Sequence, residues 1–236
     1  MTEKAQGVVV RNIARPAPEI RDGLGRFGVA TIHEAMGKRG LLEAGLRPIF
    51  DGAHISGTAV TVSVPPGDNW MIHVAVEVCV EGDLMVVAPT SPSDAGYFGE
   101  LLATALEVRG VRGLVIDAGC RDVTELRRMG FPVWSRYVSA QGTVKEALGS
   151  VNVPIVCAGH EVEPGDVVVA DDDGVVIVPS SEAQRVLEAS EQREAREEET
   201  RRRYQEGELS LDVQSMREEL AERGLRYLDQ EGDVER

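Results

Sequence analysis

Residues 113–122 read Gly-Leu-Val-Ile-Asp-Ala-Gly-Cys-Arg-Asp. The apolar, mostly branched side chains at its start predict a buried strand over residues 113–117. Apolar periodicity predicts a short helix next, over residues 123–129, and another strand over residues 132–135. A strand, a helix and a second strand in this order are typical of an α/β domain.

The same alternation continues on both sides of this segment. Upstream, residues 57–64 alternate small or polar side chains with apolar ones, as a half-buried strand does, and Asp68 and Asn69 are favourable N-caps for a helix over residues 70–78. We also expect a strand over residues 84–88, a helix over residues 98–109 and a strand around residues 154–158. Near the end, two apolar runs flank the turn Asp171-Asp172-Asp173-Gly174 and predict an antiparallel pair, residues 167–170 and 175–178. We therefore expect residues 1–180 to form one layered α/β domain.

From Ser181 onward the composition changes to a long, highly charged helix. One interpretation is a solvated helix held by ion pairs one turn apart, each contributing a few tenths of a kcal/mol. The other is an arm that packs on a neighbouring subunit. Residues 181–236 are accordingly expected to form a helical C-terminal extension.

Composition limits the classes of partner. The chain has 236 residues, 42% of them hydrophobic, and a formal net charge of -15. It can bury a core, while its acidic surface repels phosphate backbones and anionic lipid, so no nucleic acid and no membrane partner is expected. With no signal-like N-terminus and no apolar run near the ~20 residues that span a bilayer, the expected location is cytoplasmic. The three cysteines form no CxxC pair and are expected to be small buried apolar side chains.

The residues that indicate chemistry lie in two short segments. Gly99-Glu100-Leu101-Leu102 begins the helix over residues 98–109, and Arg121-Asp122 follows the 113–117 strand, with twenty residues between Glu100 and Arg121. Free N–H groups at a helix start and a planar guanidinium suit a 2-oxo carboxylate, and carboxylates with waters suit a hard divalent ion. The alternative is that Asp122 merely caps the helix that begins at Val123.

Longer phrases of the chain resemble a known family, the 4-hydroxy-4-methyl-2-oxoglutarate / 4-carboxy-4-hydroxy-2-oxoadipate aldolases. The resemblance covers nearly the whole chain and is carried by residues 33–37, 66–70, 99–104, 115–123, 131–135, 149–159 and 164–179. The motif of an acidic residue, twenty residues and Arg-Asp also occurs in the wider superfamily that includes the regulator of ribonuclease activity A.

The resemblance implies a fold, a reaction and an assembly. The implied fold is a layered α-β-β-α sandwich of the swivelling phosphohistidine-domain type with a helical C-terminal extension. The implied reaction is metal-dependent retro-aldol cleavage of a 4-hydroxy-2-oxo acid that releases pyruvate, with oxaloacetate decarboxylation as a secondary activity. The implied assembly is a homotrimer or homohexamer.

The resemblance also implies roles for residues. The backbone of Gly99, Glu100, Leu101 and Leu102 and the side chain of Arg121 would hold the pyruvyl end, and Asp122 would hold Mg2+ or Mn2+ largely through waters. Glu100 would support that water shell. A glutamate from the C-terminal helix of an adjacent subunit would complete the site, and Glu197 is the best match, although Glu198 and Glu199 follow it directly.

The enolate that such a cleavage forms needs a sink, either a metal with cationic donors or a lysine Schiff base. Among the three lysines only Lys145 is a candidate for a buried amine, and its segment is polar, so the metal route is favoured. The four histidines, His73 among them, show no metal-binding spacing and are interpreted as structural or surface residues. Two alternatives remain, a non-catalytic protein-binding regulator and a dedicated oxaloacetate decarboxylase.

Overall fold

The computed structural model describes residues 7–229. Their contacts divide the chain into two units, with the boundary between Ser190 and Glu191, whereas the sequence placed the division at residue 181. The difference arises because the first turns of the C-terminal helix belong to the first unit, where Ala183 and Val186 are buried in its core.

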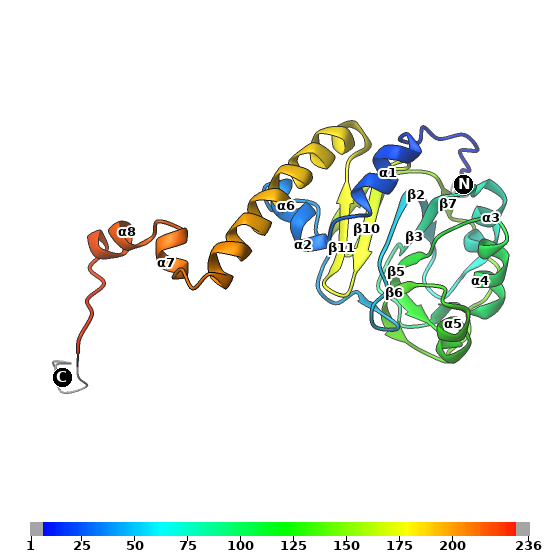
Figure 1. The fold of residues 1–236 in the computed structure, drawn as a ribbon. Coiled ribbons are helices and arrows are strands. Elements are labelled where there is room, and N and C mark those ends of the chain that lie inside the picture. Colours follow the sequence, from blue (N-terminus) through cyan, green and yellow to red (C-terminus); the bar gives the residue numbers. More distant parts are fainter. Residues whose placement is uncertain (1–6, 230–236) are drawn as a thin grey trace, which may run out of the picture. The chain divides into compact units, whose positions relative to one another are not determined.

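The first unit is built on one nine-stranded sheet (Figure 1). Its strands follow the order β1-β6-β5-β3-β2-β10-β11, with β4 paired to β5 and β7 paired to β2. The run from β6 to β2 is parallel, whereas β1, β10 and β11 pair antiparallel at the two sides. These strands and the separate β8–β9 hairpin are β1 (Arg47–Pro48), β2 (Ile55–Val64), β3 (Asp83–Pro89), β4 (Gly96–Phe98), β5 (Leu114–Cys120), β6 (Val133–Val138), β7 (Ser150–Val151), β8 (Ile155–Cys157), β9 (His160–Val162), β10 (Val167–Asp171) and β11 (Gly174–Val178).

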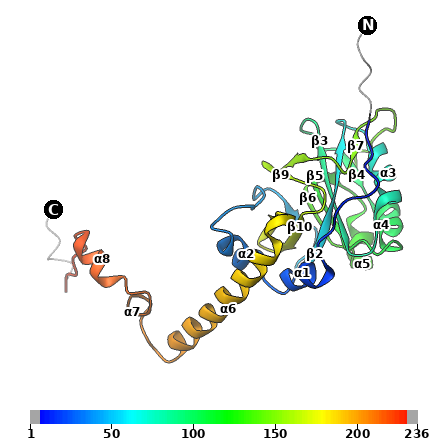
Figure 2. The ribbon, with the colours of Figure 1, turned by 90° about the horizontal axis from the view of Figure 1, so that it is seen from above.

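Helices cover the outer face of this sheet. One group lies over the parallel strands and another over β10 and β11, as Figures 1 and 2 show from two directions. The first group is α3 (Trp70–Val78), α4 (Glu100–Glu107) and α5 (Val123–Met129), and the second is α1 (Pro18–Leu24), α2 (Val29–Ala35) and the first turns of α6 (Ala183–Gln205), which the 3-10 helix η1 (Ser180–Glu182) precedes.

The inner face of the sheet packs around a second hydrophobic core. Side chains alternate between the two faces of a strand, so Met85 and Val87 of β3 pack under the helices while Leu84 and Val86 point to the other side. There they contact side chains of β5, β6, β10 and β11, including fully buried Trp134. The sheet is therefore strongly curved and barrel-like, and the fold is mixed α/β as the sequence predicted. The narrower prediction of a phosphohistidine-domain sandwich stays a prediction.

The predicted strands and helices all have counterparts in the structure, which adds the short strands β1, β4, β7 and β9. The strand expected around residues 154–158 is β8, and it pairs with β9, which was not predicted, in a hairpin separate from the main sheet. Ala158 and Gly159 both have positive φ, 43° and 79°, which is the backbone that a tight two-residue hairpin turn requires. The predicted antiparallel pair β10–β11 is confirmed, with Val169 opposite Val176.

Two expectations about residue classes can be compared with the structure. Cys79, Cys120 and Cys157 are all buried and unpaired, as predicted, and burial raises the pKa of each thiol. No helix within residues 7–229 is long and apolar enough to cross a membrane.

The second unit is helical and highly charged. It contains the rest of α6, together with α7 (Ser210–Val213) and α8 (Arg217–Glu222). Arg202 pairs with Glu199 and Glu206 at 2.6 Å each, which is the ion-pair pattern expected of a solvated helix. Packing of this unit on a neighbouring subunit stays a prediction.

Candidate functional site

The end of β5 places two charged side chains next to each other. Asp122 has a left-handed backbone, with φ 56° and ψ 34°, which costs a residue with a side chain roughly 1 kcal/mol. The preceding residue, Arg121, donates its backbone N–H to Phe98 O at 2.8 Å and so ties the end of β5 to the end of β4. Strained backbone at a strand end is often found at functional sites.

The carboxylate of Asp122 does not cap the helix that follows it. Although Asp122 occupies the N-cap position of α5, its side chain makes no capping hydrogen bond. Its Oδ2 atom instead accepts the backbone N–H of Glu100 at 3.2 Å and lies 3.7 Å from Nε of Arg121. The capping alternative is therefore wrong, and the carboxylate is directed to the start of α4.

The start of α4 is open toward this carboxylate. Gly99 is its N-cap residue and provides no side-chain cap, so the N–H groups of Leu101 and Leu102 have no acceptor within the helix. A Cβ atom on Gly99 would lie 2.2 Å from Oδ2 of Asp122, so only glycine allows this close approach. The side chain of Glu100 accepts a hydrogen bond from Thr104 Oγ1 at 3.3 Å.

These elements surround a pocket of about 140 Å³. This volume is below the ~300–1,000 Å³ typical of sites for drug-sized ligands, and it suits a small acid. The pocket is lined by Asn69, His73, Tyr97, Gly99, Leu101, Leu102, Arg121, Asp122 and Lys145.

The structure thus brings most of the predicted site residues together. Glu100 joins them through its N–H group rather than through a lining side chain. Glu197 lies on α6 in the second unit, where its carboxylate pairs with Arg193 at 2.7 Å. The roles assigned to all of these residues stay predictions.

Sequence reasoning missed one wall of the pocket. Asn69 and His73, from the start of α3, and Lys145, from the loop before β7, also line it. His73 was interpreted as structural or surface, and Lys145 was considered only as a Schiff-base amine; its side chain is exposed. The phrase over residues 66–70, which belongs to the resemblance, is the one signal that pointed to this wall.

The pocket carries net positive charge. Partial burial lowers the pKa of His73, and the nearby Lys145 lowers it further, so this imidazole is neutral at pH 7. The charged lining side chains are then Arg121, Lys145 and Asp122. Two cations and one carboxylate attract an anionic ligand locally, because surface carboxylates more than ~8 Å away are largely screened at physiological salt.

A hydrated divalent ion fits this arrangement. Within residues 7–229 no three His, Cys, Asp or Glu side chains gather as a metal site does. Asp122 is 43% exposed and uses only Oδ2 in its contacts with Glu100 and Arg121, so within the described chain Oδ1 remains available to an ion or its waters. Hard ions such as Mg2+ keep several waters and are commonly held by one or two carboxylates.

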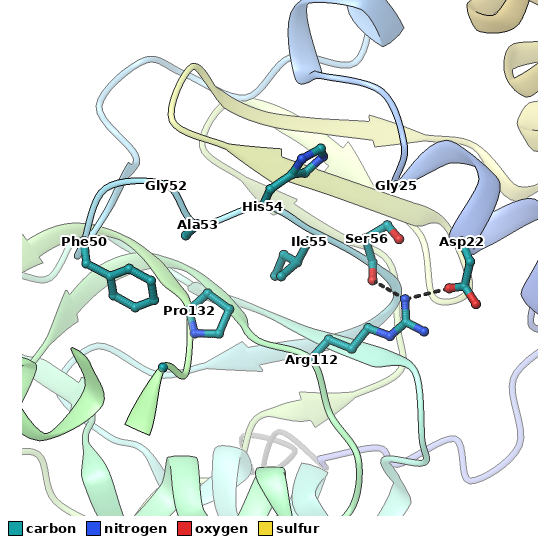
Figure 3. Close-up of a pocket in the computed structure, with 11 residues that line it drawn as sticks. Asp22, Gly25, Phe50, Gly52, Ala53, His54, Ile55, Ser56, Arg112 and Pro132 are labelled. Atoms are coloured by element: carbon teal, nitrogen blue, oxygen red, sulfur yellow. Dashed lines mark hydrogen bonds and ion pairs between the residues drawn. The ribbon is translucent and has the colours of Figure 1, made fainter. Parts of the chain in front are cut away.

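A larger pocket, of about 600 Å³, lies at the N-terminal ends of β2, β5 and β6 (Figure 3). Figure 3 shows the rings of Phe50 and Pro132 on one side and Arg112 on the other. The guanidinium of Arg112 donates hydrogen bonds to the carboxylate of Asp22 at 2.6 Å and to the backbone oxygen of Ser56 at 3.0 Å. Hydrogen bonds from Arg21 and Arg112 lower the pKa of Asp22 to about 2. This cluster joins α1 to the sheet, and ligands of open α/β sheets bind at the opposite, carboxyl edge.

Comparison with known proteins finds a matching family model and named relatives. A family model described as RraA-like, Aldolase/RraA, matches residues 29–177. A relative from Halalkalibacterium halodurans named "Putative 4-hydroxy-4-methyl-2-oxoglutarate aldolase" is 27% identical over 170 residues, which are 72% of this chain and 81% of that protein. A relative of the same name from Burkholderia multivorans is 30% identical over 62% of this chain and 89% of its own length.

A solved structure shares the fold and carries a different functional name. It is RraAS2 of Streptomyces coelicolor, described as an unusual member of the RNase ES inhibitor RraA protein family. It superposes with a TM-score of 0.72 at 29% identity and covers 80% of this chain and 99% of its own.

Proposed function

The chain belongs to the RraA-like family, and from that premise we propose that it is a divalent-metal-dependent lyase that cleaves a 4-hydroxy-2-oxo acid and releases pyruvate. The proposed substrates are 4-carboxy-4-hydroxy-2-oxoadipate and 4-hydroxy-4-methyl-2-oxoglutarate. Decarboxylation of oxaloacetate is the proposed secondary activity, because it passes through the same pyruvate enolate.

One observation carries this proposal. Asp122 precedes α5 and has a strained backbone, yet its carboxylate makes no hydrogen bond to that helix. It lines a small pocket beside Arg121 and the open start of α4 instead. A carboxylate that is carried by a strained backbone and makes no capping bond either stabilises another part of the structure or takes part in chemistry. The adjacent guanidinium and free N–H groups supply the donors that a 2-oxo acid requires.

The protein residues would act mainly on the pyruvyl end. The N–H groups of Leu101 and Leu102 would bind the carboxylate, and the guanidinium of Arg121 would face the C2 oxygen. As the C3–C4 bond breaks, its electron pair moves toward C2 and negative charge grows on that oxygen. A donor placed there can supply ~3 kcal/mol of stabilisation, by comparison with single oxyanion-hole donors.

Asp122 would hold Mg2+ or Mn2+, and Glu100 would support the waters around the ion. When bound there, the ion would act as a Lewis acid toward the enolate. Protonation of C3 then gives pyruvate. The C4 hydroxyl proton would leave to a water held by a carboxylate, for which we propose Glu197 of a neighbouring subunit in a trimer or hexamer.

One assay tests the proposal. Pyruvate release is measured with each of the two hydroxy-oxo acids and with oxaloacetate, before and after dialysis against EDTA. We expect release that EDTA abolishes and that added Mg2+ or Mn2+ restores, because a single carboxylate ligand gives only modest affinity for the ion. Full activity after EDTA dialysis would exclude the metal, and absence of pyruvate from all three substrates would exclude the lyase.

A second candidate function is a protein-binding regulator. It is favoured by the likeness to the Streptomyces protein, which is described within a family of ribonuclease inhibitors. This candidate predicts inhibition of a ribonuclease by a protein that releases no pyruvate. A dedicated oxaloacetate decarboxylase, in contrast, would release pyruvate from oxaloacetate alone.

A further inference from the structure

The pocket contains a second cation, for which the proposed reaction has no role yet. Lys145 lines the pocket with Arg121 and Asp122, and its side chain is exposed to solvent. Arg121 lies against Asp122, with 3.7 Å between Nε and Oδ2. Within residues 7–229 Lys145 makes no ion pair, so its ammonium is available to a ligand.

The backbone around Lys145 is fixed although its side chain is not. Oδ2 of Asp68 accepts the N–H of Glu146 at 2.6 Å and the N–H of Ala147 at 2.8 Å, while Oδ1 accepts Trp70 N at 2.8 Å. Asp68 is only 1% exposed. Burial alone would raise the pKa of this carboxyl, but the backbone donors outweigh burial and lower it, so Asp68 is ionised at neutral pH.

The residue before Lys145 is held as well. Val144 donates its N–H to Gly67 O at 2.9 Å and accepts the N–H of Asn69 at 3.2 Å. Residues on both sides of Lys145 are therefore bonded to the segment that begins α3, which itself contributes Asn69 and His73 to the pocket. These bonds hold the backbone on either side of Lys145 beside the pocket.

We propose that Lys145 is a specificity residue that binds a carboxylate on the leaving half of the substrate, the half that carries C4. This inference rests on the proposed function. Arg121 and the start of α4 line the same pocket as Lys145, so this pocket offers a second cation to a molecule that carries more than one anionic group. His73, neutral at pH 7, adds no charge that would compete for the carboxylate.

The alternative role for Lys145 is as a Schiff-base nucleophile. Such lysines are activated by desolvation in an apolar pocket or by an adjacent cationic group. Lys145 is exposed to solvent rather than enclosed in an apolar pocket. The two roles differ in one measurable respect, because a Schiff base is needed to enolise pyruvate whereas a carboxylate-binding lysine is not.

The test is Lys145→Gln, followed by two reactions. Cleavage is measured with 4-carboxy-4-hydroxy-2-oxoadipate, with 4-hydroxy-4-methyl-2-oxoglutarate, and with 4-hydroxy-2-oxopentanoate, whose leaving half has no carboxylate. Exchange of the methyl protons of pyruvate with deuterium, followed by NMR, reports enolisation at the pyruvyl end alone. Lys145→Arg keeps the charge, and Arg128→Gln removes one positive charge from α5, outside the pocket.

We expect Lys145→Gln to raise KM for the two carboxylate-bearing substrates by roughly tenfold or more, the effect of losing one charge-assisted hydrogen bond. The preference for these two over 4-hydroxy-2-oxopentanoate should shrink by the same factor. Pyruvate exchange should fall far less than cleavage, Lys145→Arg should restore most of the affinity, and Arg128→Gln should behave as wild type.

Two results would overturn the assignment of Lys145. Unchanged KM values in Lys145→Gln would show that the ammonium binds no carboxylate, and an equal loss of exchange and cleavage would show that it acts on the pyruvyl end. If the wild-type protein neither cleaves the acids nor exchanges pyruvate, the proposed function itself fails and this inference fails with it. Failure of the inference alone leaves wild-type cleavage intact.

Discussion

Substitution of Gly99 by alanine tests whether the position of the Asp122 carboxylate matters. The added Cβ would lie 2.2 Å from Oδ2 of Asp122 and 3.1 Å from Cγ of Arg121. Because Cβ contacts under 3.0 Å essentially do not occur, the carboxylate must move by at least 0.8 Å. One substitution therefore displaces both proposed functional side chains without changing either of them.

Gly99→Ala is expected to lower turnover and to leave stability nearly unchanged. Gly99 has φ -157°, an extended backbone that alanine adopts freely, and the side chains of Arg121 and Asp122 are about half exposed and can rotate away. The free energy of unfolding should therefore change by less than about 1 kcal/mol. Displacement of a positioned group by ~1 Å can lower turnover about 100-fold, and we expect a loss of this size in Gly99→Ala.

The assay compares pyruvate release and urea unfolding for two glycine variants. Gly28→Ala is the matched control, because its Cβ would be 3.5 Å from its nearest neighbour, Oδ2 of Asp171, which is ordinary contact. Its backbone, with φ -64°, also accepts alanine. Near wild-type turnover in Gly99→Ala would refute the reasoning, and so would equal losses in both variants.

Three further predictions concern other parts of the chain. Arg121→Lys keeps the charge but loses the planar fork, so kcat should fall roughly 100- to 1,000-fold while thermal unfolding stays unchanged; a near-normal kcat would remove Arg121 from the reaction. Mixtures of inactive Arg121→Ala and inactive Glu197→Ala subunits should regain pyruvate release if each site combines two chains, and no recovery after proven subunit exchange would count against Glu197. The pKa of Asp22 is lowered to about 2, so this carboxylate stabilises the folded protein fully above the unfolded pKa of about 3.9, and the stabilisation is lost as pH falls through 2. Asp22→Asn should flatten the decline of the unfolding free energy over that pH interval. An unchanged slope would show that the contacts of Asp22 with the two arginines contribute little.

Local sequence patterns were sufficient to predict most elements but not their closure into a curved sheet. The alternation in residues 57–64 predicts a strand because side-chain period is a local property. The pairing of β2 with β10, in which Ser56 lies opposite Val169, joins residues far apart in the chain. No local pattern indicates that partner, so the inner core around Trp134 became visible only in the structure.

The same distinction applies to the pocket. Its α4 and β5 wall follows from a helix start and a strand end, both of which the sequence shows. The wall that carries Lys145 lies in a polar loop without periodicity, and its place is set by the bonds from Glu146 and Ala147 to the distant carboxylate of Asp68. A buried aspartate that anchors a loop cannot be distinguished by sequence from one that caps a helix, and Asp68 does both.

The twenty residues between Glu100 and Arg121 have a structural explanation. From Glu100 the chain leads away from the site along α4, turns at Gly110 and returns along β5 to Arg121. Two hydrogen bonds then close this unit, from Arg121 N to Phe98 O and from Glu100 N to Asp122 Oδ2. Separation of the two segments would break both bonds, so the left-handed backbone of Asp122 is held by the same contacts that direct its carboxylate. The spacing in the motif is therefore the length of one helix, one turn and one strand, and it keeps the Asp122 carboxylate and the backbone of Arg121 in place before any ligand binds.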